Sequence, residues 1–151
     1  MKLEQAIQQS SFTSNDQKLT LNFIYTYNNF KEDQKNFFKP YDITPQQYNV
    51  LRILRGAYPN PYTTSQVRDR MLDKMSDASR IVERLVKKGL VNRTTTKSDK
   101  RLVDVIISDN GLELLSTIDK PLDHEMSSTF ARFTEEEREI FTILLDKMSK
   151  N

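Results

Sequence analysis

The sequence predicts a mainly α-helical fold with one small β hairpin. Helix-start signals followed by apolar residues at helical spacing recur along most of its 151 residues. Only residues 90–96 and 102–107 are rich in β-branched residues with strand-like alternation. The hairpin directly follows a helix with a basic face. These two elements together are the most informative part of the sequence for function.

Residues 1–13 have no strong pattern and are interpreted as an N-terminal extension. Ser14, with Gln17 three residues later, fits a capping box, and the helix it starts should run to Pro40, since proline cannot continue a helix. One face of this helix is aromatic and can either pack in the core or form a dimer interface, where aromatic residues are enriched. Its residues are Leu19, Phe23, Tyr27, Phe30, Phe37 and Phe38.

A second helix should begin at Thr44, which is followed by a proline at the first helical position and by Gln47, the partner in a capping box. It should end near Gly56, before a proline-rich turn at 58–61. Thr63 and Gln66 then predict a short helix with Val67 and Met71 facing inward.

The next helix is predicted from Ser76, whose hydroxyl is a good N-cap, to Gly89, which can adopt the left-handed conformation that ends a helix. Its two faces differ in character. Ala78, Ile81, Val82 and Leu85 form a buried stripe, while Asp77, Arg80, Arg84 and Lys87 share the opposite side. Taken alone, such a charged side is usually only a solvated face.

The hairpin follows at once, with strands at 90–96 and 102–107. Its turn, residues 97–101, holds two lysines and an arginine around Asp99. A basic tip of this kind can reach a minor groove, whose negative potential attracts lysine and arginine. A short helix, a basic helix and a basic hairpin in succession form the layout of a winged helix-turn-helix.

After the hairpin, Ser108 should cap another helix with an apolar stripe, and Pro121 should kink or break that helix near Asp119. Thr134 and Glu137 form a further capping box before the last helix. The stripes themselves allow an ordinary bundle core, a dimer interface or a partner-binding helix.

Composition excludes several classes of site. There is no cysteine, so the chain has no disulfide, thiolate metal site or cysteine redox switch, and a lone His124 cannot form a histidine-rich metal site. We expect no metal and no cofactor. The glycine fingerprints of nucleotide-binding enzymes and a histidine-based nucleophile are missing too, which argues against an enzyme. With no signal peptide or membrane-spanning apolar run, a cytoplasmic location is expected.

The net charge of +2 conceals a strong asymmetry. Residues 1–62 carry 7 basic and 5 acidic side chains, residues 63–101 carry 11 and 5, and residues 102–151 carry 5 and 11. The middle third is therefore electropositive and the last third acidic. This distribution is typical of a nucleic-acid-binding lobe joined to a part that does not contact nucleic acid.

The motif residues resemble one known family. The run SRIVERLVKKGLVNR (residues 79–93) and the later SDKRLVDVIISDNG (residues 98–111) resemble the recognition helix, the "D-x-R" wing and the following helix start of the MarR family of bacterial transcription regulators. The chain departs from the family pattern at Lys100, where arginine is common, and at Arg68, where a small residue is usual. Lysine retains a phosphate contact but not a bidentate one.

The resemblance implies a homodimer with four parts: residues 1–13 as an extension, 14–40 as an N-terminal dimerisation helix, 43–108 as the winged helix-turn-helix lobe and 109–151 as C-terminal dimerisation helices. It further implies a repressor on a pseudo-palindromic operator in double-stranded DNA, released by a small, often aromatic, acid. Arg52, Arg55 and nearby tyrosines could serve such a ligand, although these arginines also suit a solvated helix surface.

We expect the DNA contacts to come from the helix, the strand after it and the hairpin tip: Ser76, Asp77, Ser79, Arg80, Arg84, Lys87, Arg93, Lys97, Asp99, Lys100 and Arg101. The first four should reach base edges, and Arg84, Lys87 and Arg93 should contact phosphates. The alternative is a winged helix used in chromosome architecture or protein contact, which would show little sequence preference.

Overall fold

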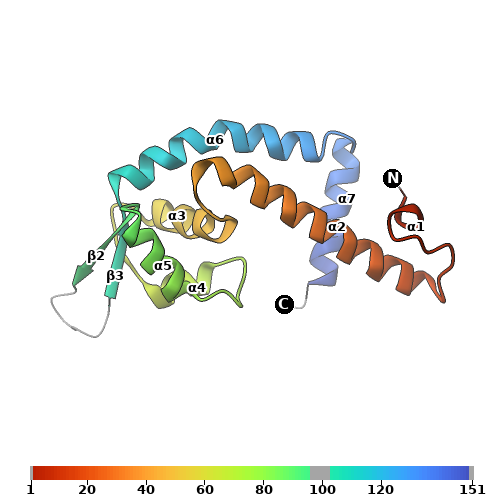
Figure 1. Cartoon of the computed structure of the whole chain (residues 1–151), viewed down its shortest axis with the longest axis horizontal. Coiled ribbons are helices and arrows are strands. Elements are labelled where there is room, and N and C mark those ends of the chain that lie inside the picture. The colour runs from red at the N-terminus through yellow and green to blue at the C-terminus, as the bar shows by residue number, and fades with distance from the viewer. Residues whose placement is uncertain (1, 96–102, 150–151) are drawn as a thin grey trace.

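The computed structural model describes residues 2–95 and 103–149 of the chain. A winged lobe, defined here as Pro45–Ile107, lies at one end of an elongated molecule, and two long helices extend from it (Figure 1). The described elements are α1 Leu3–Ala6, α2 Asn15–Phe38, the 3-10 turn η1 Lys39–Tyr41, α3 Pro45–Ala57, β1 Tyr62–Thr63, α4 Thr64–Arg70, α5 Ala78–Lys87, β2 Val91–Thr95, β3 Val103–Ile107, α6 Asp109–Thr129 and α7 Glu135–Met148. The predicted mainly helical fold with a small hairpin is confirmed.

Most helices begin where the sequence predicts. The side chains of Thr44, Thr63 and Thr134 each accept a hydrogen bond from the backbone N–H three residues later. The side chain of that later residue in turn accepts one from the threonine N–H, which completes three capping boxes. Ser14 caps α2 through the N–H of Gln17, but the Gln17 side chain accepts from the Thr13 N–H instead of closing the box at Ser14.

The sheet has three antiparallel strands in the order β1-β3-β2, one more than predicted. β3 pairs with β2 through Val91 opposite Ile107 and with β1 through Tyr62 opposite Val105. β1 has only two residues, too few for an alternating pattern in the sequence, and it exists because β3 offers an edge to pair with.

A single apolar core joins the helices of the winged lobe to its sheet. Val50, Leu51 and Leu54 of α3 are fully buried, as are Leu85 of α5 and Val105 of β3. Phe38, at the end of α2, and Leu115 and Ile118, in α6, belong to the same cluster. The long helices are therefore anchored in the lobe at the ends where they join it.

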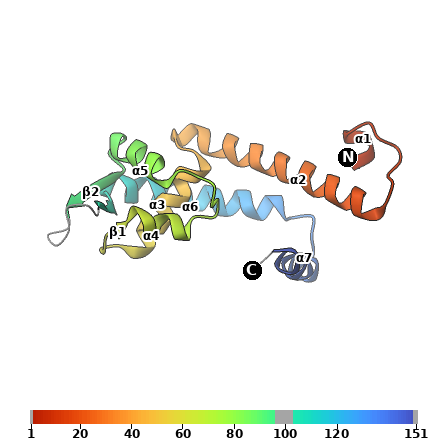
Figure 2. The same ribbon diagram turned by 90° about the horizontal axis from the view of Figure 1, so that it is seen from below.

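Pro121 was predicted to kink or break the helix near Asp119, and the break is wrong. α6 continues through Pro121 to Thr129 and lies beside α2 (Figures 1 and 2). Proline removes one N–H donor from a helix, but its fixed φ is helical, so neighbouring turns can hold the helix together. Here Ile118, one turn before the proline, is buried in the core, and Leu122 just after it packs against the core.

Away from the lobe, the apolar stripes of the long helices are exposed. On α2, Leu19, Phe23, Ile24, Tyr27 and Phe30 are all exposed, and only Phe38 of the predicted aromatic face is fully buried. α7, which runs crosswise to α6 beyond the end of that helix, has no buried residue (Figure 1). Across the described residues, no helix combines the length and apolar character that crossing a membrane requires.

Candidate nucleic-acid interface

Helix α5 begins one residue later than predicted, because its N-cap is Asp77 and not Ser76. The Asp77 carboxylate accepts a hydrogen bond from the backbone N–H of Arg80 at 3.0 Å. The Ser76 hydroxyl donates instead to Asp73 Oδ2 at 2.7 Å, and this bond, with one from the Met75 N–H, lowers the pKa of Asp73. Asp73 thus holds Ser76 in the preceding turn, and the negative Asp77 sits at the positive end of the helix dipole.

The two faces of α5 are as predicted. Ala78, Val82 and Leu85 are buried against the lobe, and Ile81 is half-buried. The other side is exposed along its whole length, and each of its predicted DNA-contacting side chains lies there: Asp77, Ser79, Arg80, Arg84 and Lys87. Packing on the core therefore fixes the orientation of α5 about its own axis, and in that orientation the polar residues share one solvent-exposed face.

Among residues 2–95 and 103–149, the charged side chains on this face form only weak ion pairs. Arg80 Nε lies 4.0 Å from Asp77 Oδ2, and Lys87 Nζ lies 3.2 Å from Glu83 Oε1. All four side chains are more than half exposed, and solvent-exposed pairs of this kind contribute about 1 kcal/mol or less. The cations can therefore exchange these partners for phosphates or base edges at little cost.

The helix ends at Gly89, which has the predicted left-handed conformation with φ +70°. The Gly89 N–H donates to Val86 O and the Leu90 N–H to Leu85 O, a Schellman motif. Lys88 is turned away from the exposed face, because its ammonium contacts the backbone carbonyl and the carboxylate of Asp42. At helical spacing Lys88 follows Ile81 and Leu85 on the buried side of the helix, whereas Lys87 follows Arg84 on the exposed side, so the two last-turn lysines have different surroundings.

The hairpin carries one described site residue. Arg93 lies on β2 opposite Val105 and is exposed. The tip residues predicted to enter a minor groove, Lys97, Asp99, Lys100 and Arg101, lie outside the described residues.

Helix α4 adds cations next to α5. Arg70 stacks over the ring of Tyr62 at 4.6 Å and donates to Gln66 O, which fixes its position at the end of the helix. Arg68, one of the departures from the family pattern, is exposed and lies near Ser65 and Asp69. The turn between α4 and α5 also exposes the large apolar side chains of Leu72 and Met75, for which sequence patterns predicted no role.

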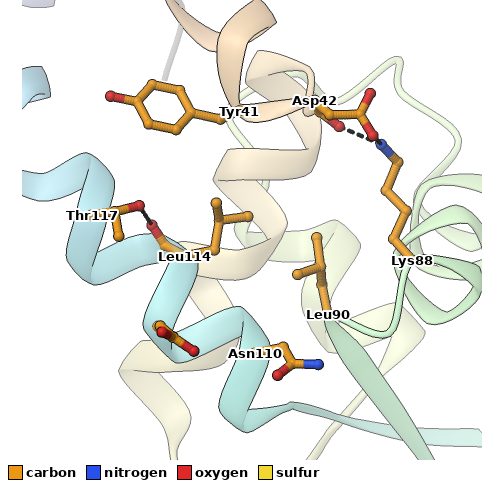
Figure 3. A pocket seen from close by; sticks show the side chains of 8 residues that line it. Tyr41, Asp42, Lys88, Leu90, Asn110, Leu114 and Thr117 are labelled. Carbon is orange, nitrogen blue, oxygen red and sulfur yellow. Dashed lines mark hydrogen bonds and ion pairs between the residues drawn. The ribbon is translucent and has the colours of Figure 1, made fainter.

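A hollow of about 630 Å³ lies where the winged lobe meets the long helices (Figure 3). It is lined by Tyr41, Asp42, Lys88, Leu90, Asn110, Glu113, Leu114 and Thr117. The arginines considered for a ligand site are not among these residues. Arg52 donates to the Tyr48 hydroxyl, and Arg55 forms a two-pronged pair with Asp119 of α6 at 2.8 and 3.0 Å.

Comparison with known proteins agrees with this architecture. Residues 41–102 match the sequence model of the MarR family. The HTH-type transcriptional regulator MhqR of Bacillus subtilis is 23% identical over 139 residues, which are 92% of this chain and 94% of MhqR.

Solved structures are similar over almost the whole chain. A MarR transcription factor from Planctomyces limnophilus is 29% identical, with a TM-score of 0.69 over 90% of this chain and 98% of its own. A mutant of Escherichia coli MarR in complex with operator DNA is 24% identical, with a TM-score of 0.77 over 93% of this chain and 100% of its own. The motif, the winged lobe and these comparisons together show that the chain is similar to transcription regulators of the MarR family, whose sequence model it matches over the winged part of the chain.

Proposed function

We propose that this protein is a sequence-specific DNA-binding regulator, a homodimer that represses transcription from a pseudo-palindromic operator. The observation that carries the proposal is α5, whose apolar face is buried in the lobe while its N-terminal end and basic side are exposed. In a helix-turn-helix the second helix enters the major groove with its N-terminal residues at the base edges. On this chain that end holds Ser76, Asp77, Ser79 and Arg80.

The phosphate contacts would come from cations farther from the N-terminus of α5. Arg84 and Lys87 lie on the exposed side of the helix, and Arg93 lies on the adjacent strand. The tip residues Lys97, Asp99, Lys100 and Arg101 would reach the flanking minor groove, with Asp99 orienting Arg101. Their role rests on the sequence and on the family resemblance.

Homodimer formation is supported by the apolar faces that one chain leaves uncovered. α7 exposes Ile140, Phe141, Ile143, Leu144, Leu145 and Met148, and α2 exposes five more large apolar side chains. Exposed apolar patches of this extent mark interaction sites. We propose that residues 14–40 and 109–151 form the dimer interface, and that two-fold symmetry then places two copies of α5 about one turn of DNA apart.

The proposal is tested by measuring DNA affinity across a salt series, on the intergenic region beside the protein's own gene and on a scrambled duplex of the same length. A preference of about 10³-fold or more, with one dimer per site, is expected of a specific regulator. Equal affinity with a steep salt dependence would instead favour an architectural protein that binds only phosphates. Repression is tested separately with a reporter fused to the promoter that carries the selected site. Expression of the reporter should rise when the gene for this protein is deleted.

We further propose that a small aromatic acid binds in the hollow of Figure 3 and releases the DNA. The Lys88 ammonium and the Tyr41 side chain line the hollow, and a ligand carboxylate could compete with Asp42 for Lys88. Because Lys88 directly follows α5, such a competition would disturb the end of the recognition helix.

Calorimetric titration with phenolic acids tests this step. Lys88→Met should lose the binding heat, whereas Lys87→Met, which changes the neighbouring lysine on the exposed face, should keep it. An unchanged heat in Lys88→Met, or ligand binding without release of the DNA, would contradict the proposal.

A further inference from the structure

The turn between α4 and α5 exposes two large apolar side chains more fully than any others among the described residues. Leu72 is 89% exposed and Met75 is 94% exposed, whereas the large apolar side chains that α2 and α7 expose range from 39% to 67%. Leaving such groups in water forgoes the free energy that their burial would provide. The turn belongs to the winged lobe, whereas the exposed stripes of α2 and α7 lie on the helices beyond it (Figure 1).

The turn is held in place at several points. The Leu72 N–H donates to Asn49 Oδ1 of α3 at 3.0 Å. Asp73 accepts from the N–H of Met75 at 3.0 Å and from the hydroxyl of Ser76 at 2.7 Å. Met71 before the turn and Ala78 after it are buried. The backbone that carries Met75 is therefore fixed relative to α5, and its side chain is left in solvent at the start of that helix.

Met75 lies two residues before the N-cap Asp77, at the end of α5 that approaches the base edges in a helix-turn-helix. The apolar feature of the major groove is the C5-methyl group of thymine. Methionine suits a contact with it, because its flexible and polarisable thioether adapts to an irregular surface. Leu72 lies five residues before Asp77, on the α4 side of the turn.

We infer that Met75 is a specificity-determining residue, which contacts the methyl group of a thymine in each half-site. The inference rests on the proposed DNA-binding function and deepens it, since it adds an apolar preference to the polar readout by Ser79 and Arg80. The chain should therefore select thymine at a fixed position beside the bases that Arg80 reads.

The test begins with duplexes that the wild-type protein selects from a random library. Each thymine of the selected site is replaced in turn by deoxyuridine, which removes the methyl group and leaves the hydrogen-bonding edge unchanged. At one position in each half-site, this replacement should weaken wild-type binding about 4-fold, the effect expected from burying one methyl-sized group. Met75→Ala should weaken binding to the thymine duplex but show no further loss on the uracil duplex.

Two variants serve as controls. Met75→Leu, which keeps an apolar side chain, should retain part of the thymine preference, and Leu72→Ala, which removes a similarly exposed apolar side chain, should keep it in full. Both positions are exposed, so the variants should melt like the wild type. A wild-type protein that selects a site but is indifferent to every uracil replacement would overturn the inference and leave the proposed function intact.

The inference would also be overturned if Met75→Ala weakened binding to the thymine and uracil duplexes equally. A Met75→Ala variant that changed the dimer dissociation constant and not the thymine preference would overturn it too. A wild-type protein that selects no sequence at all would instead contradict the proposed function itself.

Discussion

At the scale of single residues, Arg80 and Lys87 share the exposed face of α5 but lie at its opposite ends. Arg80 is close to the N-terminus of the helix, where a guanidinium can make a two-pronged contact with guanine. Lys87 is in the last turn, where its single ammonium suits a phosphate. Under the proposed function, we therefore expect the N-terminal cation to contribute to sequence specificity and the C-terminal cation to general DNA affinity.

Arg80→Ala should cost roughly 1–3 kcal/mol of binding free energy on the selected operator and little on random DNA. Lys87→Ala should weaken both duplexes alike and reduce the salt slope by about 1 per chain. Fluorescence anisotropy with both duplexes across a salt series measures the two effects. Equal losses on operator and random DNA in Arg80→Ala would refute its role in reading bases.

The cap of α5 gives a second prediction at this scale. Asp77→Ala should lower the free energy of unfolding by about 1 kcal/mol, since it leaves the Arg80 N–H without its side-chain acceptor. Ser76→Ala should cost less, because Ser76 donates only to the exposed turn. Urea unfolding compares the variants, and a larger loss in Ser76→Ala would restore Ser76 as the functional cap.

At the scale of elements, the start of α6 is packed tightly against the segment that joins α5 to β2. A Cβ added at Gly111 would lie 2.4 Å from the backbone oxygen of Leu90 and 2.7 Å from Ile107 Cγ1. Leu90 O also accepts from the N–H of Ser108, and the Ser108 hydroxyl donates to Gly89 O at 2.7 Å. The end of α5, the end of β3 and the first turn of α6 therefore form one rigid joint.

Gly111→Ala should destabilise the protein by about 1–3 kcal/mol, the usual effect of overpacking. The nearest atom to the added Cβ belongs to the backbone, which cannot shift as easily as a side chain. Gly56→Ala is the matched control, because nothing lies within 4 Å of the added Cβ and alanine favours a helix. It should stabilise the protein by up to about 1 kcal/mol. Thermal or urea unfolding measures both changes, and similar effects of the two substitutions would argue against the close contact.

The pair between Arg55 and Asp119 joins α3 to α6 and gives a pH-dependent prediction. Hydrogen bonds from Arg55 are the main cause that lowers the pKa of Asp119 below its ordinary value of 3.8. Because the folded pKa is depressed, this stabilisation is present above about pH 4 and is lost as pH falls through the folded value. The side chains are partly exposed, so the contribution should be at most about 1 kcal/mol.

Asp119→Asn should therefore lower the free energy of unfolding at pH 7, and its difference from the wild type should shrink below about pH 4. Urea unfolding at a series of pH values gives this difference directly. A difference that is independent of pH would show that charge on Asp119 contributes nothing.

At the scale of the whole molecule, the middle third of the chain and its C-terminal third differ in charge. Residues 63–101 are basic, whereas residues 102–151 are acidic and include α7 with its exposed apolar face. Under the proposed function, the acidic C-terminal region would repel DNA, so that the basic face of the lobe would meet it.

Dimer formation should be lost when a charge is placed in the exposed face of α7. Leu144→Glu should give a particle near the chain mass of 17.7 kDa, whereas the wild type should be about twice as heavy. Light scattering after size-exclusion chromatography measures the mass. Leu72→Glu, a change of the same kind in the turn before α5, should remain dimeric, and a dimeric Leu144→Glu would move the interface away from α7.

The sequence by itself determined most of the fold, because the signals involved are local. Capping residues, apolar spacing and a glycine stop act within one or two turns of the chain, and they placed α3, α4, the faces of α5 and the hairpin strands. The same spacing identified which polar residues α5 exposes.

Only the tertiary structure decided the features that depend on which partner a residue meets after folding. Asp73 captured Ser76 and moved the cap to Asp77, packing on the core carried α6 through Pro121, and an edge of β3 created β1. Asp42 binds the ammonium of Lys88, and Asp119 pairs with Arg55, one of the arginines considered for a ligand site. Asp73 and Ser76 are only three residues apart, so two local signals competed there and the folded turn decided between them. In the other cases the partner is distant in the sequence and is brought close only by folding, which a single sequence does not reveal.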